Sequence, residues 1–193
     1  MRTTIIMVWL TLSVVVAAFA GPSPPQTPPR WTRTRPLSPG SAALLAIASE
    51  RSSIVTTLLE DLEQTDLIVY LADSIPWAVS EPASYLTFLS RDGSARYLLV
   101  RIDFQRLSPP ERIARLGHEL QHALEVSVAP EVKDAAGLAA LYRRIGWEGE
   151  KDRFETDAAR ATGNRVRSQI SGRPTPALLL VRGSAAAAPL QRR

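Results

Sequence analysis

Two histidines and a glutamate stand within five consecutive residues of the chain, His118-Glu119-Leu120-Gln121-His122. Helical residues four apart lie on the same face, so His118 and His122 can hold one metal ion between them. Glu119 lies about 100° around such a helix, where its carboxylate can take a proton from a metal-bound water. The chain has only 2 histidines, and both belong to this stretch. The spacing therefore predicts a metal centre with a general base; the alternative is a pair of solvated surface histidines.

A helix that begins after Ser108 must position these side chains. Ser108 can cap the helix, Pro109 suits its first turn, Glu111 completes a capping box, and Pro130 ends it near residue 128. On a helical wheel the histidines lie opposite an apolar stripe made of Ile113, Leu116, Leu120, Ala123 and Leu124. The stripe predicts that one face packs on a core while the other presents the imidazoles to a cleft.

A catalytic zinc site usually has three protein ligands and a water. The chain has no further histidine and no cysteine, so the third ligand must be a carboxylate, and the downstream candidates are Glu125, Glu148, Glu150, Asp152, Glu155 and Asp157. We predict a helix over residues 149–170 in which Glu155 shares a face with Ala158, Ala159, Thr162, Val166 and Ile170. A carboxylate on a buried face needs a partner charge, so Glu155 is the preferred ligand, with Ala158 and Ala159 allowing close helix packing.

Two other interpretations of these carboxylates stay open. Glu125, one turn beyond His122, is the second candidate for the ligand, although it better suits a role in orienting a ligand histidine. Glu155 can instead be a solvated side chain in an ion pair with Arg160 or Lys151.

The motif His118-Glu119-x-x-His122, followed by Glu155-Thr156-Asp157-Ala158, resembles the gluzincin branch of the zincin metallopeptidases. That resemblance covers residues 85–170 and implies a zincin-like α+β fold with Zn²⁺ on His118, His122 and Glu155. It also implies a peptidase in which Glu119 is the catalytic base. The chain departs from the family at Ala159, where some gluzincins carry Asp, and in having no downstream histidine as electrophile.

The implied reaction is hydrolysis of a peptide bond. Glu119 takes the proton of the zinc-activated water and passes it to the leaving amine. The developing oxyanion needs a further donor, for which Tyr142, Arg143 and Arg144 are weak candidates, because a core tyrosine and solvated arginines explain them better. An extended substrate can pair with an exposed strand edge.

The remaining elements predict a small sheet and several helices. Apolar periodicity favours one helix over 41–64 and a buried strand over 66–72. Strands over 85–90 and 95–104 flank a turn at Asp92-Gly93, and a short helix over 135–145 ends at Gly146. The predicted α+β fold packs the hairpin sheet on the N-terminal helix and the motif helix, with a helical lower subdomain after them.

Composition and the chain's ends add a domain plan and a location. Residues 1–20 have the pattern of a signal peptide, 21–40 form a proline-rich linker, 41–171 the domain, and 172–193 a disordered tail rich in Ala and Pro. Export to a secreted or periplasmic location follows from the signal segment, which contacts the membrane only if it is not cleaved. The net charge of +4 comes from scattered arginines, so we expect no nucleic-acid partner.

Two further functions compete with a peptidase that acts on peptide or protein substrates. The first is a non-catalytic module that retains zinc as a structural feature. The second is a cell-envelope interaction protein whose working parts are the proline-rich linker and the tail. The sequence predicts no oligomeric state.

Overall fold

The computed structural model describes residues 30–73, 82–148 and 154–172. All the elements below belong to the unit that begins at Trp31. The predicted signal peptide and nearly all of the predicted tail lie outside the described residues. The described part contains five helices and a small mixed sheet, so the predicted α+β class is confirmed.

Four strands form the main sheet in the order β1-β2-β4-β3, with bounds Thr34–Pro36 (β1), Leu67–Ala72 (β2), Ser84–Asp92 (β3) and Ala95–Ile102 (β4). The first three in that order run parallel, and β3 pairs antiparallel with β4. Gly93 has a φ of 55° at the tip of the β3–β4 hairpin, so the predicted Asp-Gly turn is confirmed. Strand β1 lies inside the segment for which the sequence predicted an extended linker.

The predicted single N-terminal helix is wrong, because two helices stand in its place. These are α1, Pro39–Arg51, and α2, Ser53–Glu63. Ser52 between them is extended, and its side chain accepts a hydrogen bond from the Val55 amide, so it ends one helix and caps the next. In the described part of the chain, no single helix has the length and hydropathy of a membrane span, and α1 and α2 pass that test only as a pair bent by 113°.

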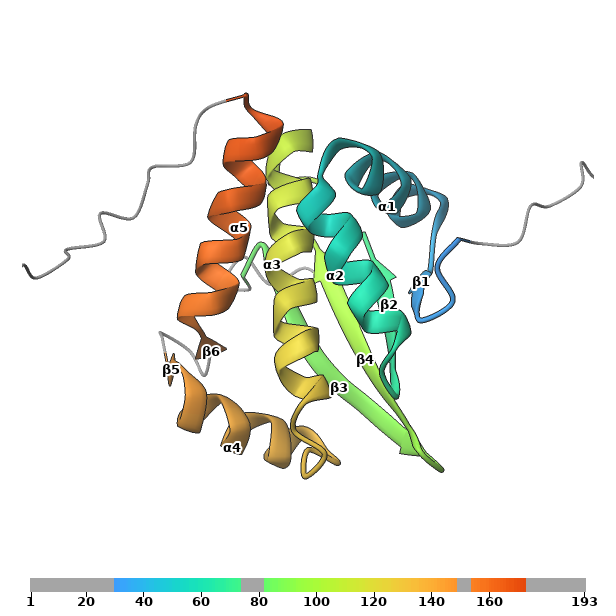
Figure 1. The fold of residues 1–193 in the computed structure, drawn as a ribbon, viewed down its shortest axis with the longest axis vertical. Helices are drawn as coiled ribbons and strands as arrows, with labels where there is room; N and C mark the ends of the chain where they lie inside the picture. The colour runs from blue at the N-terminus through green and yellow to red at the C-terminus, as the bar shows by residue number, and fades with distance from the viewer. Residues whose placement is uncertain (1–29, 74–81, 149–153, 173–193) are drawn as a thin grey trace, which may run out of the picture. The chain divides into compact units, whose positions relative to one another are not determined.

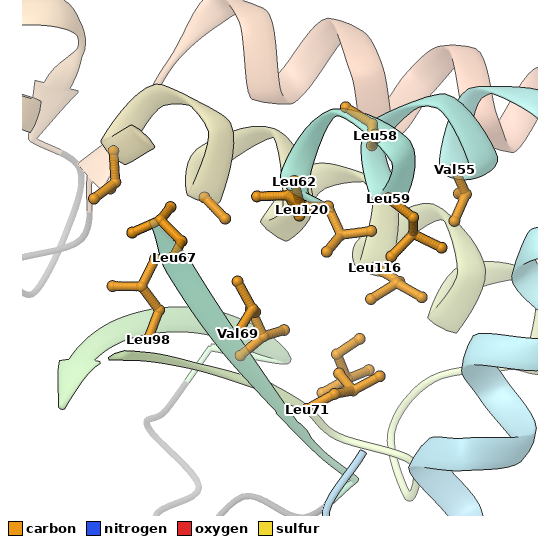
Figure 2. Packing of buried hydrophobic residues seen from close by; sticks show 14 of the residues in the cluster. Val55, Leu58, Leu59, Leu62, Leu67, Val69, Leu71, Leu98, Leu116 and Leu120 are labelled. Atoms are coloured by element: carbon orange, nitrogen blue, oxygen red, sulfur yellow. The ribbon is translucent and has the colours of Figure 1, made fainter. Parts of the chain in front are cut away.

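The motif helix α3 spans Pro109–Ser127 and lies on one face of the sheet beside α2 (Figure 1). Both hydrogen bonds of the predicted capping box, between Ser108 and Glu111, are present. Figure 2 shows strand residues such as Val69 and Leu98 directed toward α2 and α3, where Leu59, Leu62 and Leu116 meet them. These side chains are fully buried, so the apolar stripe of α3 fixes the helix on the sheet as predicted.

The C-terminal elements pack around the opposite side of α3. Helix α4 is Ala135–Ile145, and a two-stranded sheet follows, made of β5, Trp147–Glu148, and β6, Phe154–Glu155. Helix α5, Asp157–Ile170, then runs alongside α3 (Figure 1). Glu155 thus lies on a strand immediately before a helix, and the predicted helix over 149–170 is wrong at its N-terminal end.

Candidate metal centre

His118, Glu119 and His122 form a compact cluster whose ligand atoms lie within 4.8 Å of one another. Their exposed fractions are 8%, 2% and 4%. The helix repeat brings them together, and α5 covers the face that carries both imidazoles. The sequence predicted that this helix would approach the motif helix closely, and the contact of Gly163 with His118 confirms that approach.

Glu155 reaches the cluster from β6. Its Oε1 atom lies 3.8 Å from Nε2 of His118 and 3.8 Å from Nε2 of His122. Ligands at about 2.1 Å from a tetrahedral metal stand about 3.4 Å apart, so a contraction of about 0.4 Å brings Glu155 Oε1 to the required distance from each imidazole nitrogen. Two imidazoles and one carboxylate are a donor set that can hold a metal ion.

Both histidines have hydrogen-bond partners outside the cluster. His122 Nδ1 lies 2.9 Å from Glu125 Oε2, and Thr156 Oγ1 donates to Glu125 Oε1 at 2.6 Å. The Ala159 backbone hydrogen-bonds His118. Such contacts fix the tautomer and orientation of ligand histidines. Glu125 occupies the orienting position that the sequence favoured for it, and Nε2 of each ring is left to face Glu155.

Glu119 is held by a residue from the sheet. Ser84 Oγ, at the start of β3, donates to Glu119 Oε1 at 2.7 Å, and the same oxygen lies 4.0 Å from His118 Nε2. The carboxylate is thus close to the point where the two Nε2 atoms and Glu155 converge. Ser84 is its hydrogen-bond donor within the described residues.

Burial shifts the protonation equilibria of the cluster. It lowers the pKa of His118 to about 3, with further lowering from the charges of His122 and Arg115. It raises the pKa of Glu119 above the usual value for a glutamate. Burial also acts to lower the pKa of His122, but the hydrogen bond to Glu125 and the charges of the nearby glutamates outweigh it and raise that pKa. A neutral His118 and a basic Glu119 suit metal binding and proton transfer.

Close backbone contacts place Glu155 and α5. A side chain on Gly146 would put its Cβ 2.1 Å from the Glu155 carbonyl oxygen, so β6 can approach the end of α4 only because residue 146 is glycine. A Cβ on Gly163 would lie 3.2 Å from His118 Cβ and 3.6 Å from His118 Nδ1. Gly163 and the fully buried Ala159 therefore allow the close helix contact, whereas Ala158, predicted for that role, is exposed.

The other predicted residues have partners elsewhere. The hydroxyl of buried Tyr142 donates to the His122 carbonyl oxygen at 3.2 Å, and the same burial raises its pKa well above 10. Arg144 pairs with Glu131 at 2.6 Å, and Arg143 lies 3.8 Å from Glu148. Asp157 is exposed and pairs with Arg160. Glu150 and Asp152 lie outside the described residues.

Sequence reasoning missed three residues that support the cluster. Thr156 carries a detectable signal, because a threonine before an acidic first turn is typical of a helix N-cap. Gly163 stands four residues after Ala159, a small-residue spacing that indicates close helix packing. Ser84 carries no local signal, because its contact with Glu119 joins residues 35 apart.

No protein-family model matches the chain, and no characterised protein or solved structure shows significant similarity to it. The case for a metal centre therefore rests on the geometry of the cluster.

Proposed function

We propose that this protein is an exported zinc-dependent metallopeptidase, similar in its chemistry to the gluzincins. The observation that carries the proposal is the convergence of Nε2 of His118, Nε2 of His122 and Oε1 of Glu155, with the Glu119 carboxylate beside them. Two imidazoles and a glutamate are the ligand set of known zinc peptidases. Export is proposed from the signal pattern of residues 1–20 alone.

The metal would be held by His118, His122 and Glu155. When bound, zinc supplies a Lewis acid that polarises the scissile carbonyl and lowers the pKa of a coordinated water. Glu119 accepts the proton of the attacking water and later donates it to the leaving nitrogen, as a C–O bond forms and the C–N bond breaks. Ser84 keeps the Glu119 carboxylate in one orientation.

Strand β3 offers the substrate a place to bind. It is an edge of the sheet within the described residues, and its first residue, Ser84, contacts the proposed base. A peptide that pairs with this edge as an added strand would run past Glu119. The proposed substrate is therefore an extended segment of a peptide or an unstructured protein.

The test compares wild type with Glu119→Gln, which retains an oxygen acceptor for Ser84. We expect both proteins to bind one zinc per chain by elemental analysis. Cleavage of an unfolded protein substrate should fall by about 10²–10⁴ in the variant. Zinc-loaded wild type that cleaves no substrate in a Glu119-dependent way would overturn the proposal.

The second candidate is a zinc-binding module without catalytic activity. It is favoured by one observation: Tyr142, Arg143 and Arg144 each have another partner, so none is aimed at an oxyanion beside the cluster. This candidate predicts that chelation lowers the melting temperature while no peptide is cleaved. The two candidates thus differ in turnover and agree in metal content.

A further inference from the structure

A cavity of about 250 Å³ opens against one side of the metal cluster. His118 and Glu155 form the wall that it shares with the cluster, and Arg115, Arg160 and Arg167 line it as well. We call it the arginine cavity. It is smaller than the roughly 300–1,000 Å³ of pockets that enclose a drug-sized ligand, so it suits a single side chain or chain end.

Helix periodicity explains why the arginines meet there. Arg115 stands three residues before His118 on α3, so both lie on the side that faces α5. On α5 the lining residues are Arg160, Gly163, Asn164 and Arg167, and their spacing of three, four and seven marks one face of a helix. Gly163 leaves open the space between the two helices that a larger side chain would fill.

The positive charge of the cavity is only partly balanced. Arg160 pairs with Asp157 at 2.7 Å and stacks over the Trp147 ring at 5.1 Å. Arg167 donates to the neutral side chain of Asn164 at 2.8 Å. Among the residues that the structure describes, the Arg115 side chain forms neither a hydrogen bond nor an ion pair.

Glu111 is an acidic residue one turn before Arg115. It accepts hydrogen bonds from the Ser108 backbone and hydroxyl at the start of α3. These hydrogen bonds lower the pKa of Glu111, and the charges of Arg167 and Arg115 also help to lower it, but neither arginine forms an ion pair with it. Glu155 is the acidic residue that lines the cavity, and its charge would be shared with a metal cation. Two guanidinium groups thus remain without a carboxylate partner on the cavity wall.

We propose that the arginine cavity is a specificity site that binds a carboxylate of the substrate, next to the bond that is cleaved. The planar guanidinium matches a carboxylate through paired, charge-assisted hydrogen bonds. The inference rests on the proposed peptidase function, because it assigns the substrate class for that site. The carboxylate belongs either to an Asp or Glu side chain or to the C-terminus of the peptide.

The experiment measures binding, so that it does not depend on turnover. Zinc-loaded Glu119→Gln protein is titrated with fluorescent hexapeptides. The parent peptide is neutral and has a C-terminal amide. In the first set of peptides, a Glu replaces Gln at each position in turn. In the second set, a free carboxylate replaces the C-terminal amide. We expect the peptides of one set to bind about tenfold more tightly than the neutral parent peptide. That set shows whether the carboxylate comes from a side chain or from the C-terminus.

Three arginine variants locate the effect. Arg115→Gln and Arg167→Gln should remove most of the carboxylate preference while zinc content and binding of the neutral peptide stay unchanged. Arg165→Gln is the matched control, because Arg165 belongs to the same helix, bonds Thr162 and does not line the cavity. It should keep the preference.

Three results would overturn the inference. The first is equal binding of charged and neutral peptides. The second is a carboxylate preference that survives in both Arg115→Gln and Arg167→Gln because the carboxylate binds the metal. The third is a loss of the carboxylate preference in Arg165→Gln as large as in the two cavity variants. Failure of the peptidase proposal has a different signature. In that case the arginine-dependent preference is present, and zinc-loaded wild type cleaves none of the peptides.

Discussion

The His122 imidazole is oriented by two side chains, Glu125 and Thr156, that connect α3 to the start of α5. Glu125 bonds its Nδ1 atom, and Thr156 bonds Glu125 while its hydroxyl also accepts the Ala159 amide at 3.1 Å. Thr156 therefore caps α5 and positions a candidate ligand with one oxygen. Its amide also donates to Glu155 Oε1 at 2.9 Å. Thr156 thus contacts one candidate ligand, Glu155, directly and another, His122, through Glu125.

Replacing Thr156 with valine keeps the shape of the side chain and removes the hydroxyl. We expect Thr156→Val to lose about 1 kcal/mol of stability with the N-cap and about 10–100-fold in metal affinity with the orienting contact. Thr156→Ser should restore both. Competition with a chromophoric chelator gives the affinity, and a valine variant with wild-type affinity would show that Glu125 needs no such support.

At the scale of elements, the geometry of the candidate metal site depends on how closely α5 packs against α3. Gly163 is the contact point with His118, so bulk at this position must push the helix or the ligand aside. We expect Gly163→Val to lower the free energy of unfolding by about 1–3 kcal/mol and to weaken zinc binding. Ala161→Val is the control on the exposed side of α5, where we expect only a propensity cost of about 0.5 kcal/mol. Similar losses in both variants would contradict this account.

Element predictions from the sequence succeeded where the signal was local. The start of α3 and the tip of the β3–β4 hairpin follow from Ser108, Glu111 and Gly93, whose caps and turn need only their neighbours. The break between α1 and α2 was missed, because apolar periodicity continues across Ser52 while its side chain caps the second helix.

The same contrast applies to the candidate site. The histidines and Glu119 meet through a helix repeat that the sequence displays. Glu155 was chosen by a helical wheel that does not apply, because Thr156 starts the helix after it; the residue nonetheless lies 3.8 Å from both histidines. Its placement depends on the pairing of β5 with β6, which joins Trp147 to Glu155 and Glu148 to Phe154. Strands of two residues carry no periodic signal that could predict this pairing.

Across the whole molecule, one guanidinium joins the sheet to the end of the motif helix. Arg96 of β4 is 3% exposed and binds both carboxylate oxygens of Asp66, before β2, at 2.7 and 2.8 Å. Its Nη1 atom also donates to the carbonyl oxygens of Val126 and Ala129 at the C-terminal end of α3. The helix that carries both histidines is thus fixed at the end distant from its cap.

This contact makes stability depend on pH. The hydrogen bond from Arg96, together with its charge, lowers the pKa of Asp66 below 3.8. A lowered folded-state pKa means that the stabilisation is present above the unfolded pKa and is lost as the pH falls through the folded pKa. Asp66→Asn should therefore lower the free energy of unfolding by about 1 kcal/mol at pH 6, a value that takes account of solvent screening of this partly exposed side chain. The difference should shrink below about pH 4.

Urea unfolding of wild type and Asp66→Asn between pH 6 and pH 2.5 measures this difference. The exposed Asp61 on α2 provides a control, because Asp61→Asn removes a carboxylate that has no ion pair in the described residues. If the difference in free energy of unfolding between wild type and Asp66→Asn stays constant down to pH 2.5, the charge of Asp66 is not the cause of that difference.

The segment formed by β6 and α5 carries Glu155, Arg160 and Arg167, whereas α3 carries the histidines and Arg115. A cation at the cluster and a carboxylate in the arginine cavity therefore both require the same docking of α5 on α3. In a thermodynamic cycle, each ligand changes the affinity for the other by one common factor, and we expect this factor to be an increase because both ligands favour the same docking. We expect zinc titrations with and without the carboxylate peptide, and peptide titrations with and without zinc, to return that same factor. Slower amide exchange in α5 should accompany either ligand.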